Sequence, residues 1–163
     1  MMLLNKYLKG LNNLTAYQGD SHIQNQLTTK KFDLIFGCNL IDRLHTPIEW
    51  VKQSQVQNLP MKYFFSHSNL QAMLREGGLL IIASPYTWKP EHTAVENWLG
   101  GYHKNAENYF TVDGLKEALM PNLVLLEEKK IPFVIPDADG TFQYTYSNCT
   151  IFGDPSKEIL FKN

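Results

Sequence analysis

Two short apolar runs constrain the fold of this chain more than any other feature. The runs are "FDLIFGC" at 32–38 and "GGLLIIAS" at 77–84, and both are rich in strand-forming residues. Nearly continuous apolar character is typical of parallel strands covered on both faces, because a strand with one solvated face alternates apolar and polar residues. Helical patterns lie between and around these runs. We therefore expect an α/β sheet, mostly parallel, with right-handed crossovers.

The remaining segments continue this alternation of helices and strands. Apolar residues recur at helical spacing in three stretches: 2–10, 46–75 and 111–119. We expect the middle stretch to hold two helices, the second ending at Gly77-Gly78, because glycine is common just past a helix C-terminus. Thr111 is the expected N-cap of the last helix. A short strand, "LTAYQGD", is expected at 14–20.

The C-terminal part of the chain is expected to form an antiparallel hairpin. The two strands would be "NLVLLEEKKIPFVI" (122–135) and "TFQYTYSNCTIFG" (141–153), and the turn residues "PDADG" lie between them. The 163 residues suit one domain with a core, and no linker-like stretch interrupts them. We therefore predict a single domain over 1–163, with 153–163 as its tail.

Composition excludes several classes of protein. A formal charge of −1 gives no overall attraction to nucleic acid or to anionic lipid, and no apolar run is long enough to cross a bilayer. Cys38 and Cys149 lie far apart without a CxxC spacing, which indicates reduced thiols in a cytoplasmic protein. The five His residues lack the spacing of helical metal ligands, so we expect no metal site.

Polar and aromatic side chains follow three of the expected strands. Asp20 follows the first strand, while Asn39, Asp42 and Arg43 follow the second. The third is followed by residues that include Tyr86 and Trp88. Ligands of open α/β sheets bind outside the carboxyl ends of the strands, so these side chains are candidates for one small-molecule pocket. Each also has a structural alternative, as a turn residue, a cap, a local ion pair or a packing aromatic.

Four strings resemble one family. "FDLIFGCNLIDRL", "GGLLIIASPYTW", "ENWLGG" and "IPFVI…FQYT" are similar to the C-terminal methyltransferase domain of ovothiol-biosynthesis enzymes, the 4-mercaptohistidine N-methyltransferases. The resemblance covers about residues 14–152. It implies a Rossmann-like (class I) methyltransferase sheet with an antiparallel C-terminal hairpin. It also implies S-adenosyl-L-methionine as methyl donor and the imidazole of a mercaptohistidine as acceptor.

The resemblance implies roles for individual residues. Those expected on the donor side are Asp20, Ser21, Asn39 and Leu40. Those expected on the acceptor side are Arg43, Tyr86, Trp88 and Trp98, and Asp42 is the candidate general base.

The expected donor-binding half of the family, with its glycine-rich turn, has no counterpart here before residue 14. We therefore expect an incomplete sheet whose activity depends on an upstream segment. The alternative hypothesis is a non-catalytic remnant or subunit that binds a partner through its open sheet edge, with a homo- or hetero-oligomer completing the sheet. The expected partner is the sulfoxide-synthase portion of the same pathway.

Overall fold

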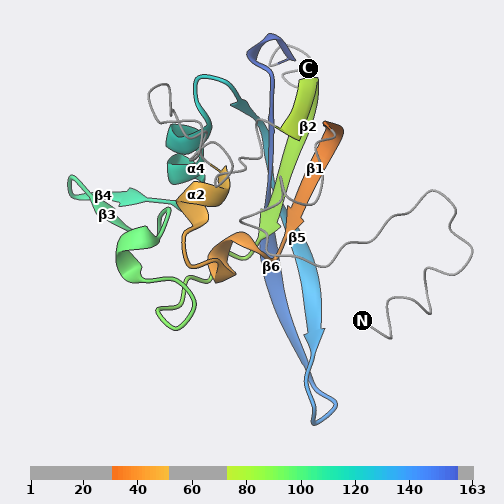
Figure 1. Cartoon of the computed structure of the whole chain (residues 1–163). Helices are drawn as coiled ribbons and strands as arrows, with labels where there is room; N and C mark the ends of the chain where they lie inside the picture. Colours follow the sequence, from red (N-terminus) through yellow and green to blue (C-terminus); the bar gives the residue numbers. More distant parts are fainter. Residues whose placement is uncertain (1–30, 52–72, 158–163) are drawn as a thin grey trace, which may run out of the picture.

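A computed structural model of the chain describes residues 31–51 and 73–157. Four strands form the main sheet in the order β1-β2-β6-β5 (Figure 1). Their bounds are Phe32–Cys38 for β1, Leu74–Ser84 for β2, Val124–Pro136 for β5 and Phe142–Gly153 for β6. The helix predicted at 2–10 and the strand predicted at 14–20 lie outside the described residues.

The expectation of a mostly parallel, Rossmann-like sheet is wrong. Among the described strands, only β1 and β2 pair in parallel, whereas β2 pairs with β6 and β6 with β5 in antiparallel fashion. The C-terminal hairpin was correctly predicted, but its second strand inserts between β2 and β5. The hairpin therefore makes up half of the four-stranded sheet rather than an addition to its edge.

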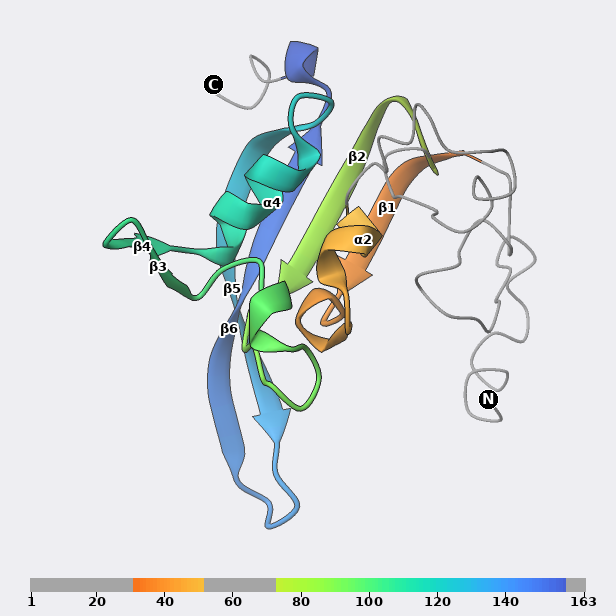
Figure 2. The same cartoon turned by 60° about the vertical axis from the view of Figure 1, so that its left-hand side comes forward.

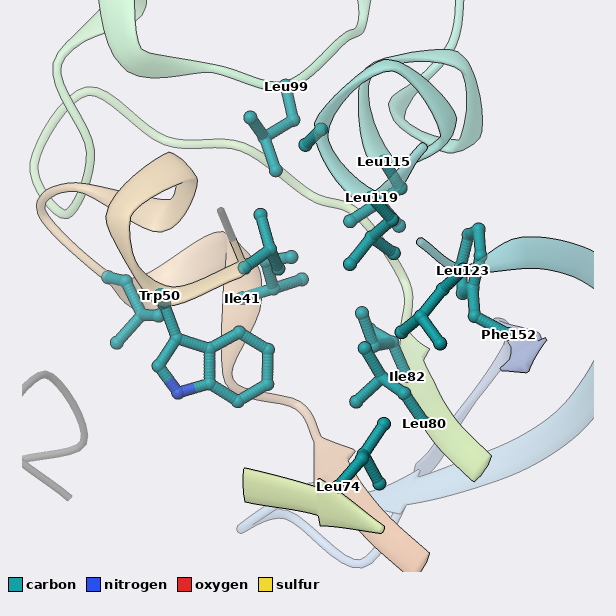
Figure 3. Packing of buried hydrophobic residues seen from close by; sticks show 13 residues of the cluster. Ile41, Trp50, Leu74, Leu80, Ile82, Leu99, Leu115, Leu119, Leu123 and Phe152 are labelled. Carbon is teal, nitrogen blue, oxygen red and sulfur yellow. The ribbon is translucent and has the colours of Figure 1, made fainter. Parts of the chain in front are cut away.

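One face of the sheet is covered by helices. Helix α2 (Pro47–Val51) and helix α4 (Thr111–Leu119) lie on the same side of the sheet (Figures 1 and 2). Figure 3 shows Trp50 of α2 and Leu115 of α4 packed toward Leu80 and Ile82 of β2. Leu80 and Leu115 are fully buried. Burial of such side chains contributes about 1.5–3 kcal/mol each, so this layer is the main source of stability.

Among the described residues, little covers the opposite face of β1, which we call its open face. Leu34 and Phe36 are 52% and 59% exposed, although the apolar run predicted burial on both faces. On the covered face, a β-carbon at Gly37 would come within 2.6 Å of the Trp50 ring. Among the described residues no helix packs on the open face, because both α2 and α4 lie on the other side.

Two local expectations need correction. β2 begins at Leu74, so the segment expected to end a helix at Gly77-Gly78 is strand. Gly77 has φ +71° within this strand, a conformation that favours glycine in strands as well as at helix ends. Helix α4 was predicted at the right residues, but Phe110 is its N-cap and Thr111 its first helical residue.

A long connection links β2 to α4. It contains the short 3₁₀ helix η4 (Val95–Asn97) and the small hairpin of β3 (Tyr102–Lys104) and β4 (Glu107–Tyr109). Another 3₁₀ helix, η2 (Ile41–Arg43), lies between β1 and α2. A last 3₁₀ turn, η5, spans Pro155–Lys157. Within residues 31–51 and 73–157, none of the helices has both the length and the apolar character needed to cross a membrane.

Candidate functional site

The two parallel strands end side by side. Cys38 of β1 pairs with Ala83 of β2, and the Asn39 N–H donates a 2.8 Å hydrogen bond to the Ala83 carbonyl. Asn39 has φ +50° and Tyr86 has φ +54°, so both chains leave the sheet through left-handed non-glycine residues. Such residues cost free energy and cluster at functional sites. This edge is therefore the first candidate for a binding site.

Asp42 joins the two strand ends. It follows β1 on η2, its side chain is only 1% exposed, and Ser84 donates a 2.6 Å hydrogen bond to its Oδ1. Its Oδ2 accepts from the Thr87 N–H at 2.9 Å and from the Thr87 hydroxyl at 3.2 Å. Buried carboxylates are stable only when paired in this way. The geometry gives Asp42 a positioning role at the end of β2, because its oxygens are engaged and covered.

Arg43 completes the same connection. Its Nη1 donates to Asp42 Oδ2 at 3.1 Å and to the Thr87 carbonyl at 2.9 Å, while Nη2 donates to the Thr87 hydroxyl at 3.1 Å. The guanidinium is 36% exposed. It holds the Thr87 backbone beside η2 and keeps part of its surface toward solvent, where a ligand can reach it.

Tyr86 turns from the edge back toward the sheet. Its hydroxyl lies 3.3 Å from the Thr150 hydroxyl on β6, and Thr150 donates to the Ile82 carbonyl at 3.2 Å. Either hydroxyl can be the donor of the Tyr86–Thr150 pair. Burial raises the pKa of Tyr86 to about 12, and the hydrogen bond with Thr150 only partly offsets this. Tyr86 is therefore a neutral phenol at physiological pH.

Trp88 and Trp98 form a stacked pair. Their ring centroids are 6.3 Å apart with an interplanar angle of 21°. Trp88 Nε1 donates to the Thr111 hydroxyl at 2.8 Å, and Trp98 Nε1 donates to the Thr93 carbonyl at 2.9 Å. Both rings are half-buried with their polar atoms satisfied, so the pair connects the end of β2 to the start of α4.

The glycines of "WLGG" permit close packing of this connection. A β-carbon at Gly100 would overlap the backbone of Phe110 and Thr111, and one at Gly114 of α4 would overlap the Leu99 carbonyl. Gly101 has φ +86°. The "WLGG" motif thus has a structural explanation: Gly100 lies against the backbone that begins α4, and the Leu99 carbonyl lies against Gly114 within α4.

A cavity of about 300 Å³ lies beyond Trp98. Its lining includes the three aromatic rings of Trp98, Tyr102 and Tyr109 and the carboxylates of Glu96 and Glu117. The rings of Tyr102 and Tyr109 stack with centroids 5.2 Å apart. Aromatic faces and carboxylates both attract cations, so this cavity suits a small, positively charged or planar group.

The protein's own lysine shows this preference. Lys104 Nζ lies 4.4 Å from the centre of the Tyr109 ring and donates to Glu117 Oε1 at 2.8 Å. The hydrogen bond from Lys104, followed by that from Tyr109, lowers the pKa of Glu117. Burial and the Glu117 carboxylate raise the pKa of Tyr109. The cavity wall therefore carries an ionised Glu117 carboxylate beside the neutral phenol of Tyr109.

The structure brings together most of the residues expected at the site. Asp42 and Arg43 meet the end of β2, and Trp88 contacts Trp98. The Asn39 side chain is exposed at the edge, whereas Leu40 is half-buried against the core. Asp20 and Ser21 lie outside the described residues, so their expected contacts with the donor stay predictions.

Sequence reasoning missed the residues that organise the site. Thr87, Thr93, Thr111 and Thr150 accept or donate the hydrogen bonds that position the edge, and threonine has no sequence pattern that identifies such roles. The β3–β4 hairpin was also missed, because its turn uses Ala106 at φ +65° rather than glycine. Only the flanking tyrosines of "YHKNAENY" could have indicated it.

Within the part of the chain that the structure describes, no group of three or more His, Cys, Asp or Glu side chains is arranged to hold a metal ion. No protein-family profile matches the chain, and no curated protein matches it in sequence.

The fold is similar to that of a solved structure described as "Conversion of a Disulfide Bond into a Thioacetal Group during Echinomycin Biosynthesis". The TM-score is 0.53 at 10% sequence identity, and the likeness covers 94% of this chain. The chain spans 61% of the length of that protein. At this identity the likeness concerns the fold alone.

Proposed function

We propose that this chain acts as an S-adenosylmethionine-dependent N-methyltransferase whose acceptor is the imidazole of a mercaptohistidine. The observation that carries the proposal is the carboxyl edge of β1 and β2, where Asn39 and Tyr86 both adopt left-handed backbone conformations. Ligands of α/β sheets bind at such edges. The choice of acceptor rests on the four sequence strings that resemble 4-mercaptohistidine N-methyltransferases. The distant likeness of fold supports the reaction class.

The residues at the edge fit a nucleoside-like donor. Among the described residues the Asn39 amide makes no side-chain hydrogen bond and is exposed, so it can bind a polar ligand atom. Leu40 offers an apolar surface next to it. When bound, S-adenosylmethionine supplies an electrophilic methyl group. The contribution of Asn39 and Leu40 is orientation, which accounts for much of the rate of such transfers.

The cavity beside Trp98 fits the acceptor. An amino acid with an imidazole ring presents a planar ring and an ammonium group, and the cavity offers aromatic faces together with Glu96 and Glu117. Glu117 is already paired with Lys104. Glu96 is exposed and is the carboxylate that we expect to meet the ammonium group.

Cys38 and Cys149 are both free thiols, which supports a reducing compartment such as the cytoplasm.

Two matched substitutions test the proposal. Asn39→Ala is expected to weaken S-adenosylmethionine binding at least about tenfold in calorimetry, which corresponds to about 1.4 kcal/mol. Asn105→Ala removes another left-handed asparagine, in the β3–β4 turn, and should leave donor affinity unchanged. Saturable binding must also be followed by N-methylation of mercaptohistidine, detected by mass spectrometry. The proposal is that the chain binds the donor by itself, in place of the expected dependence on an upstream segment, so absence of donor binding by the wild-type chain would refute it.

The acceptor side has its own test. Glu96→Gln should raise KM for mercaptohistidine several-fold without changing donor affinity, because it removes a charge from the cavity wall. Glu91→Gln, at an exposed carboxylate outside that wall, is the control. Equal KM values for the two variants would exclude the cavity as the acceptor site.

A second candidate function is that of a partner-binding subunit, and the open face of β1 favours it. Leu34 and Phe36 are exposed on an edge strand, a feature that promotes association. The candidate partner is the sulfoxide-synthase portion of the ovothiol pathway. A titration of that purified protein should give saturable binding that Phe36→Ser weakens. Donor binding without partner binding would reject this candidate.

A further inference from the structure

The β5–β6 hairpin extends well past the end of the sheet. We call the protruding part, residues 131–136 of β5 and 142–147 of β6 with the turn between them, the distal arm (Figures 1 and 2). The last residue of β6 paired with β2 is Asn148, opposite Ser84. The distal arm is therefore a two-stranded ribbon, a structure that is marginal in water unless it packs against something.

The distal arm exposes large apolar side chains. Phe142, Tyr144 and Tyr146 are 60%, 83% and 60% exposed. They alternate along β6, so they lie on one face of the ribbon, with Val134 opposite Tyr144 on the same face. Given about 150–250 Å² for each aromatic side chain, the three expose on the order of 400 Å² per copy. Two copies together expose on the order of 800 Å², so the backbone and neighbouring side chains such as Val134 must contribute the rest of the roughly 1,200 Å² that a specific interface buries.

The two edges of the distal arm differ. The β5 edge contains Pro132 and Pro136, which cannot donate to a neighbouring strand and so block pairing. The β6 edge, "FQYTYS" at 142–147, contains no proline and no charged residue. Among the described residues, its backbone hydrogen bonds within the sheet go to β5 alone, because β2 ends at Ser84. One edge is thus closed to further pairing and the other is open.

We propose that two copies of this chain pair through the open β6 edge, antiparallel and across a two-fold axis centred on Tyr144. In this register Tyr144 of one copy lies opposite Tyr144 of the other, and Phe142 lies opposite Tyr146. All three aromatic side chains then meet aromatic side chains on the same face, the most favourable kind of cross-strand pair. The two four-stranded sheets become one continuous sheet.

A second copy is the occupant that the charges favour. No Asp, Glu, Lys or Arg occurs in 141–153, so antiparallel pairing of the segment with itself brings no like charges together. A nucleic acid or an anionic membrane would find no positive charge on this edge. The symmetric pairing also follows from the edge itself, since identical antiparallel strands satisfy a closed two-fold interface.

Sedimentation equilibrium of the full chain tests this inference. The wild-type protein should form a concentration-dependent dimer. Tyr144→Lys should raise the dimer dissociation constant at least about tenfold, because it places two positive charges opposite one another. Ile135→Lys, on the β5 strand and the opposite face, is the matched control and should leave the constant unchanged. A wild-type chain that stays monomeric up to about 100 μM, or equal constants for both variants, would overturn the proposal.

Cross-linking gives a second readout that does not depend on a charged variant folding well. In a Cys38→Ser background, Tyr144→Cys should form a disulfide-linked dimer under mild oxidation, because residues opposite one another in an antiparallel pair lie at disulfide distance. Ile135→Cys should stay monomeric. Cross-linking at residue 135 but not at residue 144 would refute the proposed register and the use of the β6 edge.

Discussion

The two faces of β1 have opposite surroundings although the strand's sequence is apolar throughout. On one face, Gly37 lets the Trp50 ring lie directly against the backbone and Ile35 packs against the core. On the other, Leu34 and Phe36 are more than half exposed. An apolar run thus indicates that a strand is suited to burial, but coverage depends on which helices reach each face. Here α2 and α4 both lie on the same side.

The same contrast separates the two ends of β6. Phe152 is fully buried beneath the helices, whereas Tyr144 is among the most exposed apolar residues of the described chain. Their strand is one continuous element. Burial therefore follows the helical layer rather than the apolar character of the strand, and substitutions matched across this boundary test the account.

The largest effect is expected for paired leucines on the two faces. Leu80→Ala removes a fully buried side chain and should cost about 3 kcal/mol of unfolding free energy, because it leaves a cavity in the core. Leu34→Ala, on the open face, should cost less than about 1 kcal/mol. Chemical denaturation of both variants measures the difference. Similar losses would mean that the open face is covered in solution.

Two glycine substitutions compare a close contact in the helical layer with a turn in open space. Gly114→Ala should destabilise by about 2 kcal/mol, because its methyl group would overlap the Leu99 carbonyl. Helix propensity alone predicts the opposite sign, since alanine is favoured over glycine inside helices. Gly140→Ala meets no atoms and should cost only the strain of φ +84°, about 1 kcal/mol. A stabilised Gly114→Ala protein, measured by thermal unfolding, would contradict the packing of α4 on Leu99.

Two aspartates allow a comparison of a buried carboxylate, Asp42, with an exposed one, Asp33. Asp42→Asn should cost about 2 kcal/mol, because an amide cannot accept from all the donors that surround the carboxylate. Asp33 forms an exposed ion pair with Arg75, in which the two side chains are 79% and 57% exposed. Asp33→Asn should therefore change stability by less than about 1 kcal/mol. Urea titrations at neutral pH measure both losses. Equal losses would contradict the claim that the hydrogen bonds of Asp42 stabilise the end of β2.

The remaining comparison concerns two tyrosines, and at neutral pH it has no effect. The folded-state pKa of Tyr86 is about 12, above the value of about 10 expected in the unfolded chain. The unfolded state thus loses its proton first, and stability should fall between about pH 10 and pH 12, by at most about 1.4 kcal/mol per pH unit. Tyr86→Phe should reduce this slope, while Tyr144→Phe, at an exposed residue, should not. Identical pH profiles for the two variants would show that Tyr86 is not buried.

Much of the local structure was predictable from the sequence. The strands at 32–38 and 141–153 and the helix at 111–119 follow from runs and spacings that have one physical explanation each. The pairing of the strands does not. Nothing in "TFQYTYSNCTIFG" states that this strand lies between β2 and β5, because strand order depends on contacts between residues far apart in the chain. The incorrect prediction of a mostly parallel sheet arose because these long-range contacts could not be inferred from the sequence.

The candidate site was predictable in part for the same reason. Asn39 and Tyr86 were identified because strand ends can be located from the runs that precede them. Asp42 was considered a general base, yet the structure surrounds it with Ser84, Thr87 and Arg43. Those partners come from a different strand, so sequence spacing could not have distinguished a buried carboxylate from one that faces a ligand.

The most direct test of the central claim is amide NMR of the wild-type chain during titration with S-adenosylmethionine. Binding at the carboxyl edge predicts saturable shifts of amides in 38–40 and 84–88, with the distal arm beyond residue 131 unaffected. Asn39→Ala should weaken these shifts. Saturable shifts confined to other segments, or none at any donor concentration, would contradict the claim that the adjacent ends of β1 and β2 form the donor site.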